Sequence, residues 1–310
     1  MDESSPLAAR TVARRVDRPL LGYVLLAALT LIWGLNWPVM KIALGEFPPW
    51  TFRALHVPTG GLVLLLIVRA AGMTLAVPRE RWTALAAVSL FNVPIWYVAA
   101  SYGIINLTSG RAALVAFTMP LWASLLAVPI LGEALTARRI AALGLGIAGI
   151  AVLMGGTWST LGTTPIGVAF MLMNSVSWAV GTVMLKRIDW RMSTLALTGW
   201  QLTIGGIPIV IGALLLEMGD IRTASGGAWA AIAYVTFLAT SLGTYAWFKI
   251  VSLFPAGVSA VGTLLIPVVG VVSGNLLLGE PLGWREAAAL ALISSALAIN
   301  LMMPAKRPAS

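Results

Sequence analysis

The stretch MPLWASLLAVPILGEALTARRIAALGLGIAGIAVLM, Met119–Met154, has a second copy in this chain, LIPVVGVVSGNLLLGEPLGWREAAALALISSALAINLM, Leu265–Met302. In both copies a Gly-Glu pair separates two apolar runs, and a proline stands 12 residues before the glycine. Pro120 therefore aligns with Pro267 at an offset of 147 residues. Leucine and alanine matches between apolar runs are common by chance, so the proline and the Gly-Glu pair carry the repeat.

The composition around this repeat is that of a membrane protein. Of the 310 residues, 59% are hydrophobic and only 10% are charged, and the mean hydropathy is +0.93. Soluble domains are about 25% charged. The charges form short clusters between apolar stretches of about 20 residues, the length that a helix needs to cross a bilayer core. These stretches lack the alternation of barrel strands, so we expect an all-α membrane protein.

The apolar stretches predict ten transmembrane helices. No long polar stretch interrupts them, so the sequence leaves no room for a separate soluble domain. The first stretch is too long for the apolar region of a cleaved signal peptide, which has about 7–15 residues. The predicted spans are 20–44, 49–71, 82–103, 108–131, 136–155, 165–188, 194–217, 227–251, 255–279 and 283–303.

The distribution of basic residues predicts the orientation. With the N-terminus in the cytoplasm, 15 Lys and Arg residues fall inside and five outside, namely Lys41, Arg53, Arg111, Arg222 and Arg285. This asymmetry agrees with the positive-inside rule. We therefore expect cytoplasmic tails at 1–19 and 304–310 and a multi-pass protein of the inner (plasma) membrane.

The repeat divides the chain into two predicted five-helix domains, 20–155 and 165–303. Earlier in each half the offset is 145 residues, and there Trp33 aligns with Trp178. Five is an odd number of spans, so the second half enters the membrane from the side opposite to the first. Such inverted repeats are widespread in secondary transporters, where the substrate binds near mid-membrane between the halves.

The two Pro…Gly-Glu blocks, together with Trp33-Gly34-Leu35-Asn36-Trp37 in the first span, resemble the EamA domains of the drug/metabolite transporter superfamily. The resemblance covers about residues 20–303. It implies ten helices, cytoplasmic termini, and export or exchange of small metabolites, often amino acids. Members of this superfamily often carry an arginine in the second span, where this chain reads Ala54-Leu55-His56. A role of that arginine is therefore in question.

Several kinds of chemistry are excluded or disfavoured. The chain has no cysteine, hence no disulfide or thiolate site. No Asp or Glu lies near the middle of a span, and there is no phosphate-binding loop for ATP. The basic residues stand at span ends without interleaved aromatics, which disfavours nucleic-acid binding. We expect no enzyme activity, no catalytic residue, no metal and no cofactor. The predicted partners are a small-molecule substrate and membrane lipids.

His56 is the only histidine and lies about 10 Å into the second span, at 1.5 Å per residue. It is the side chain in a span that would titrate near neutral pH, so protons are a candidate coupling ion. The alternatives are a hydrogen bond between helices and a position facing the lipid headgroups. Its repeat partner, Gln201, is also polar, which favours an inward orientation for both.

Aromatic and amide side chains in the deeper parts of the spans are the candidates for lining a substrate cavity. Amides need polar partners in a membrane, and aromatic rings suit an amphiphilic substrate. Tryptophan also gathers at membrane interfaces, which is the alternative for each ring. The candidates are Trp33, Asn36, Trp37, His56, Asn92, Trp96, Tyr97, Trp178, Gln201, Thr240 and Tyr245.

Three further groups have structural alternatives. Lys41, Arg53 and Arg111 either attract an anion or extend towards lipid headgroups. Pro120 and Pro267, predicted in mid-helix, are hinge candidates or fixed kinks. The Gly-Glu carboxylates are expected to cap the spans that follow them.

The sequence thus predicts a secondary transporter, an exporter of neutral or aromatic amino acids or similar amphiphilic compounds. It would work by alternating access between the repeats. The alternative is a membrane binding or regulatory protein that keeps this fold without transport. A lipid-modifying enzyme is disfavoured, because no nucleophile-base pair is present.

Overall fold

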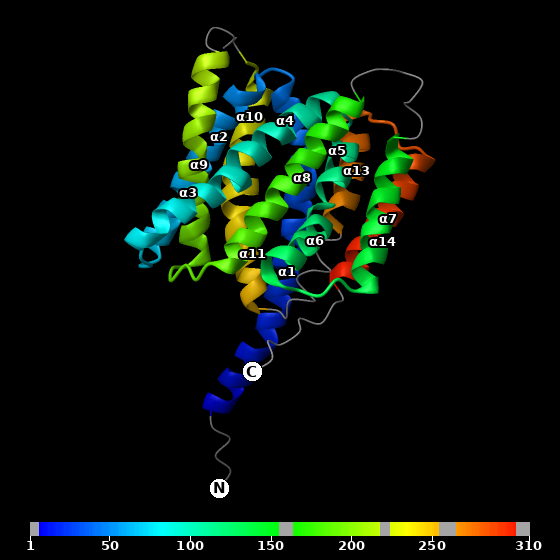
Figure 1. Cartoon of the computed structure of the whole chain (residues 1–310). Helices are drawn as coiled ribbons and strands as arrows, with labels where there is room; N and C mark the ends of the chain where they lie inside the picture. Colours follow the sequence, from blue (N-terminus) through cyan, green and yellow to red (C-terminus); the bar gives the residue numbers. More distant parts are fainter. Residues whose placement is uncertain (1–5, 155–163, 218–223, 254–264, 302–310) are drawn as a thin grey trace.

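The computed structural model describes residues 6–154, 164–217, 224–253 and 265–301, and these fold into helices only (Figure 1). The predicted C-terminal tail and the first residues of the predicted ninth span lie outside the described residues. The elements are α1 Pro6–Leu44, α2 Pro49–Ala70, η1 Arg79–Arg81, α3 Trp82–Leu90, η2 Phe91–Ile95, α4 Trp96–Asn106, α5 Ser109–Ala116, α6 Met119–Leu131, α7 Ala137–Met154, α8 Thr164–Arg187, α9 Thr194–Leu216, α10 Gly226–Ala233, η3 Tyr234–Leu242, α11 Gly243–Leu253, α13 Leu265–Leu278 and α14 Trp284–Leu301.

Within the described residues, seven helical segments are long and apolar enough to cross a membrane. They correspond to predicted spans one to four and six to eight. The three other predicted spans contain α7 and α14, which have 18 residues each and are not among these seven segments, and α13, an apolar helix of 14 described residues. A multi-pass helical membrane protein is therefore confirmed, whereas the number ten stays a prediction.

Contacts between the two halves are reciprocal. Helix α1 packs against α13 and α11, and its counterpart α8 packs against α5, α6 and α4. The pair α2 and α9 and the pair α7 and α14 each join equivalent helices of the two halves. Figure 1 shows these pairs at opposite edges of the bundle, with α1 and α8 between them.

Among the described residues, two spans contain a π-helical segment, η2 in the first half and η3 in the second. A π-turn leaves carbonyl groups without their usual helical donors. Side chains of the opposite half fill this role: Ser177 Oγ donates to Phe91 O at 2.5 Å, and Trp33 Nε1 donates to Ala239 O at 2.9 Å. The irregular turns are therefore held by contacts between the halves.

The fourth predicted span is broken rather than continuous. Helix α5 ends at Ala116, and α6 begins at Met119 after a turn at Phe117 and Thr118. Pro120 lies in the first turn of α6, where a backbone N–H has no helical partner to lose. The prediction of Pro120 in mid-helix was wrong for this reason. Pro267 likewise lies in the first described turn of α13, so neither proline breaks a described helix.

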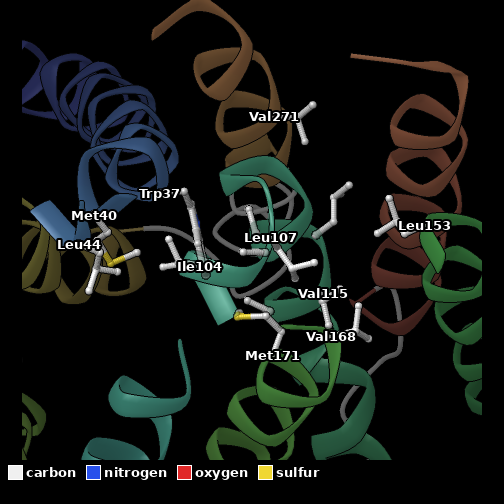
Figure 2. Close-up of a cluster of buried hydrophobic side chains, with 14 of the residues drawn as sticks. Trp37, Met40, Leu44, Ile104, Leu107, Val115, Leu153, Val168, Met171 and Val271 are labelled. Carbon is white, nitrogen blue, oxygen red and sulfur yellow. The ribbon is translucent and has the colours of Figure 1, made fainter. Parts of the chain in front are cut away.

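The main apolar core lies where α1, α4, α5, α7, α8 and α13 meet (Figure 2). Trp37, Ile104, Val115, Met171 and Val271 are buried in it. The outer surface is apolar too: Leu66 is 67% exposed and Leu215 77% exposed. Leucine in such numbers on the surface is expected of a protein that faces lipid rather than water.

The two ends of the bundle differ in charge. Glu46, Glu217, Glu280 and Glu286 lie at the end that holds the α1–α2 and α13–α14 connections, which we call the glutamate end. The opposite end holds the connections α2–α3, α6–α7 and α8–α9, which carry the Arg and Lys clusters. We call it the basic end. It corresponds to the predicted cytoplasmic side.

Candidate functional site

A cavity of about 540 Å³ lies between the halves and extends to the α8–α9 connection at the basic end. Ligand sites in proteins typically measure about 300–1,000 Å³. A smaller cavity of about 110 Å³ between α6 and α7 is lined mainly by aliphatic side chains. The larger cavity is lined by Asn92, Val93, Trp96, Tyr97, Trp178, Thr182, Leu185, Lys186, Trp190, Met192, Thr194, Leu197, Thr198, Gln201, Leu202, Trp247 and Phe248.

An amide pair crosses this cavity from one half to the other. Asn92 Nδ2 on η2 donates to Gln201 Oε1 on α9 at 2.9 Å. Asn92 Oδ1 packs closely against Gly181 of α8. A methyl group placed on Gly181 would lie 1.9 Å from this oxygen. Trp96 adds a buried indole Nε1 that has no hydrogen-bond partner among the described residues. A buried donor without a partner suits a polar group of a ligand.

Tyr97 forms the wall of the cavity that faces the glutamate end. Its ring packs edge-on against Trp96, with centroids 4.4 Å apart, and against His56 at 5.6 Å. Its hydroxyl lies near Thr240 on η3 in the other half. Tyr97 therefore links the cavity, the first half and the second half at one point.

Arg53 lies behind Tyr97 and is completely buried. Its Nε donates to Ser101 Oγ at 2.6 Å, its Nη1 lies 3.4 Å from Met40 Sδ, and its Cζ lies 5.3 Å from the Tyr97 ring centroid. No carboxylate of the described residues lies within 4.0 Å of it, and Nη2 has no partner. The expectation that Arg53 extends to lipid headgroups was wrong, because α1 and α4 enclose it.

His56 is also completely buried and lies one turn further along α2. Its Nδ1 is 3.0 Å from the Phe52 carbonyl oxygen, so Nδ1 carries the proton and donates to that oxygen. Nε2 is then the acceptor and faces Arg53 Nη1 at 3.5 Å. In this neutral imidazole each ring nitrogen has a partner: Nδ1 donates to the Phe52 carbonyl oxygen, and Nε2 accepts from Arg53. The position facing lipid headgroups is excluded.

Of the other predicted cavity residues, five contribute to the lining and the rest lie elsewhere. Asn92, Trp96, Tyr97, Trp178 and Gln201 line the cavity. Trp33 is not in the lining and packs against Trp247 instead, Asn36 faces Met40, and Trp37 belongs to the apolar core. Tyr245 is 42% exposed, Thr240 is buried, and neither lines the cavity.

Sequence reasoning missed several residues of this region. Lys186 and Trp190 line the cavity but were not among its predicted residues, and Arg53 was considered only as a residue of a span end. Asn174 is fully buried, and its Nδ2 donates to the Trp96 carbonyl oxygen at 2.9 Å. A lone amide inside an apolar span is a signal that would have identified Asn174. No local signal marks Arg53 as buried.

At the glutamate end, three carboxylates cap helices of the opposite half. Glu217 Oε1 and Oε2, at the end of α9, accept hydrogen bonds from Trp50 N at 3.1 Å and Thr51 N at 2.7 Å, at the start of α2. Glu46, beyond α1, accepts from Ser225 N and Ser225 Oγ, both at 2.6 Å, at the start of α10. The Ser225 hydroxyl and amide hold the pKa of Glu46 below its usual value, so this carboxylate is ionised at neutral pH.

Glu280 makes the most buried of these caps. Its carboxylate accepts from Ser109 N and Ser109 Oγ, both at 2.7 Å, and from Gly110 N at 3.3 Å. Lys41 Nζ lies 3.4 Å from Glu280 Oε1. Glu280 thus caps α5 in the other half rather than the helix that follows it. The prediction was wrong because Glu280 accepts from Ser109, 171 residues away, and not from the start of the following helix.

The repeat-related Glu133 caps no helix start either. Instead it forms an ion pair with Arg139 at the basic end. At the glutamate end, Arg111 pairs with Glu286, with Nη2 to Oε1 at 2.6 Å, and so it does not extend to headgroups. The four carboxylates of the glutamate end therefore tie the halves together there, while the cavity lies towards the other end.

Comparison with known proteins identifies the type of molecule. Residues 20–155 and 165–302 both match the EamA-like transporter family. The chain belongs to this family. The EamA-like chain is therefore a membrane transporter and not an enzyme. Its family membership also agrees with an apolar outer surface and with a cavity between two similar halves.

Two relatives align with the EamA-like chain over most of their length. The transporter YvbV of Bacillus subtilis is 29% identical over 93% of this chain and 94% of its own. A protein named "Probable amino-acid metabolite efflux pump" in Salmonella typhimurium is 28% identical over 87% of this chain and 91% of its own. A solved crystal structure aligns with a TM-score of 0.64 at 22% identity, over 90% of this chain and 95% of that one, and supports the fold.

Proposed function

We propose that this protein exports neutral or aromatic amino acids, or similar small amphiphilic metabolites, across the inner membrane. The cavity between the halves carries the proposal, since its tryptophans and its Asn92–Gln201 pair suit a solute with an apolar part and a polar part. The relatives named as amino-acid metabolite efflux pumps support the same substrate class.

We further propose that transport proceeds by alternating access between two inverted halves. The reciprocal contacts of α1 and α8 and the paired π-helices η2 and η3 support an inverted arrangement. In this state the carboxylate caps close the glutamate end, and the cavity reaches the basic end. With the basic end in the cytoplasm, as the positive-inside rule favours, the state faces inward.

The test is flux in proteoliposomes that contain the purified protein. We expect saturable counterflow of at least one labelled amino acid from a panel that also includes nucleobases and sugars. Trp96→Ala should raise the half-saturating concentration by about tenfold, because an aromatic contact and its indole donor are lost. Trp284→Ala is the matched control: Trp284 is 70% exposed and lies outside the cavity lining. Absence of flux for the whole panel would contradict transport and favour a binding or regulatory role.

Proton coupling through His56 remains a separate hypothesis, and the hydrogen bonds favour a fixed role instead. Glutamine can present an acceptor to Arg53 as Nε2 does, whereas leucine cannot. We expect His56→Gln to keep flux within about twofold of the unaltered protein, with the same dependence on pH. His56→Leu should lose about tenfold, because a hydrogen bond to a charged group is worth about 1.5–3 kcal/mol. A flat pH profile in His56→Gln would instead assign proton coupling to His56.

A further inference from the structure

We propose that Arg53 binds the carboxylate of the transported solute on the path between the cavity and the glutamate end. This inference rests on the proposed function and specifies its substrate class: small amphiphilic molecules that bear a carboxylate. It also gives a role to a buried charge that has no partner of opposite sign among the described residues.

No carboxylate of the described residues lies within 4.0 Å of Arg53. A buried guanidinium is normally paired with a carboxylate, since the loss of water around it is otherwise uncompensated. Here the contacts are a hydroxyl, a thioether, a neutral imidazole and aromatic rings, from Ser101, Met40, His56, Phe52 and Tyr97. Nη2 remains open within the described part of the chain. A ligand carboxylate would supply both the missing charge and the missing acceptor.

The position of Arg53 places it on the transport path. It lies four residues after Pro49, the first residue of α2, hence about 6 Å from the start of that helix. Tyr97 lines the cavity and also faces the guanidinium, so this one ring separates the two. Thr240 of the opposite half lies near the Tyr97 hydroxyl. Movement of η3 against the first half would give the Tyr97 ring room to turn, and a carboxylate could then take its place beside Arg53.

Lys186 is the competing cation, and its surroundings are less suited to the role. Among the described lining residues it alone is charged, but it is exposed at the basic end of the cavity. Water and salt screen an exposed ammonium, whereas the enclosed guanidinium is shielded from both. The planar guanidinium can also donate two parallel hydrogen bonds to one carboxylate. We therefore assign carboxylate recognition to Arg53.

The first test uses the unaltered protein and three matched compounds. Counterflow of labelled L-phenylalanine is measured in competition with unlabelled L-phenylalanine, its carboxamide and 3-phenylpropionate. We expect 3-phenylpropionate to compete and the carboxamide to compete at least about tenfold more weakly than L-phenylalanine, the size of one charge-assisted hydrogen bond. Equal competition by the carboxamide would overturn the proposal, and this comparison needs no variant that could misfold.

The second test locates the recognition with variants. Arg53→Gln should remove the preference for the acid over the amide. Arg69→Gln is the matched control, because Arg69 is an exposed arginine on the same helix. The preference should survive there. If Lys186→Gln removes the preference and Arg53→Gln keeps it, the assignment to Arg53 is wrong. Size-exclusion profiles establish that each variant is folded, and the competition test in the unaltered protein decides should Arg53→Gln aggregate.

A failure of the proposed function is distinguishable from a failure of this inference. Flux without acid-over-amide preference leaves transport intact and removes the role of Arg53. Absence of flux for every solute overturns transport. In that case binding of 3-phenylpropionate, followed by tryptophan fluorescence in the unaltered protein and in Arg53→Gln, still decides the inference. Loss of binding in Arg53→Gln supports it, and equal binding in both proteins overturns it.

Discussion

Replacing Gly61 by alanine is expected to force α2 and α9 apart and to destabilise the protein strongly. A methyl group on Gly61 would lie 2.8 Å from the Leu202 Cβ and 2.8 Å from the backbone nitrogen of Thr203. A backbone atom cannot rotate away, so the helices themselves must shift. Overpacking of this kind costs about 1–3 kcal/mol. We expect the melting temperature in detergent to fall by roughly 5 °C, measured by the loss of the monodisperse size-exclusion peak on heating.

Gly144→Ala is the control for this change. Gly144 also lies inside a helix, α7, but a methyl group there would meet nothing within 4 Å. Alanine favours helix over glycine by about 1 kcal/mol, so Gly144→Ala should leave the melting temperature unchanged or raise it slightly. If both variants melt alike, close packing at Gly61 does not hold the two halves together.

The helical spans were predictable because lipid leaves the backbone little choice. The predicted span 49–71 became α2 Pro49–Ala70, and the predicted span 194–217 became α9 Thr194–Leu216. Apolar length alone decides such boundaries, since a backbone in hydrocarbon must satisfy its own hydrogen bonds. The same reasoning cannot find the π-helices η2 and η3, because their extra turns are stabilised by Ser177 and Trp33 from the other half.

The cavity residues were predictable only in part. Asn92 and Gln201 are conspicuous as amides in apolar spans, and they do meet. Trp33 and Tyr245 have the same residue types and similar depths as lining residues, yet they face elsewhere, because the helix rotation that decides this is set by packing. The sequence places Arg53 near a span end, where long basic side chains usually reach the headgroups. Its burial follows from α1 and α4, which no local pattern reveals.

The carboxylate caps were missed for a related reason. A glutamate after a helix end suggests a cap on the next helix, and that helix is the nearest one in sequence. Glu280, Glu217 and Glu46 instead reach helix starts in the opposite half. These contacts depend on how the halves meet. They therefore bear directly on how the glutamate end opens and closes.

Replacing Glu280 by glutamine is expected to favour opening at the glutamate end. The change removes the charge that holds Ser109 N, Ser109 Oγ and Lys41 around one carboxylate. Hydrogen bonds to a charged acceptor contribute about 1.5–3 kcal/mol. A loss of about 2–3 kcal/mol from the closed state shifts its ratio to the open state by roughly thirty- to hundredfold, at 1.4 kcal/mol per factor of ten.

The absence of cysteine from the sequence makes this shift measurable. A single cysteine in place of Thr198, which lines the cavity, has no background thiol to compete with it. A maleimide that does not cross membranes is added from either side. With Glu280 in place, we expect the maleimide to label this cysteine from the basic end. With Glu280→Gln in addition, labelling from the glutamate end should become faster, and labelling from the basic end slower.

Glu133→Gln is the matched control, since Glu133 is the repeat counterpart of Glu280 but pairs with Arg139 at the opposite end. It should not increase labelling from the glutamate end. Faster labelling in Glu280→Gln could mean either exchange between two states or a general loosening of the helices. Adding a solute that binds in the cavity distinguishes these two explanations. If the solute reverses the accessibility of Glu280→Gln, the variant still exchanges between two states, as alternating access requires. If labelling becomes equally faster from both sides and the solute does not change its rate, the capped helices have merely loosened. Glu280 would then be a structural contact that does not control access from the glutamate end.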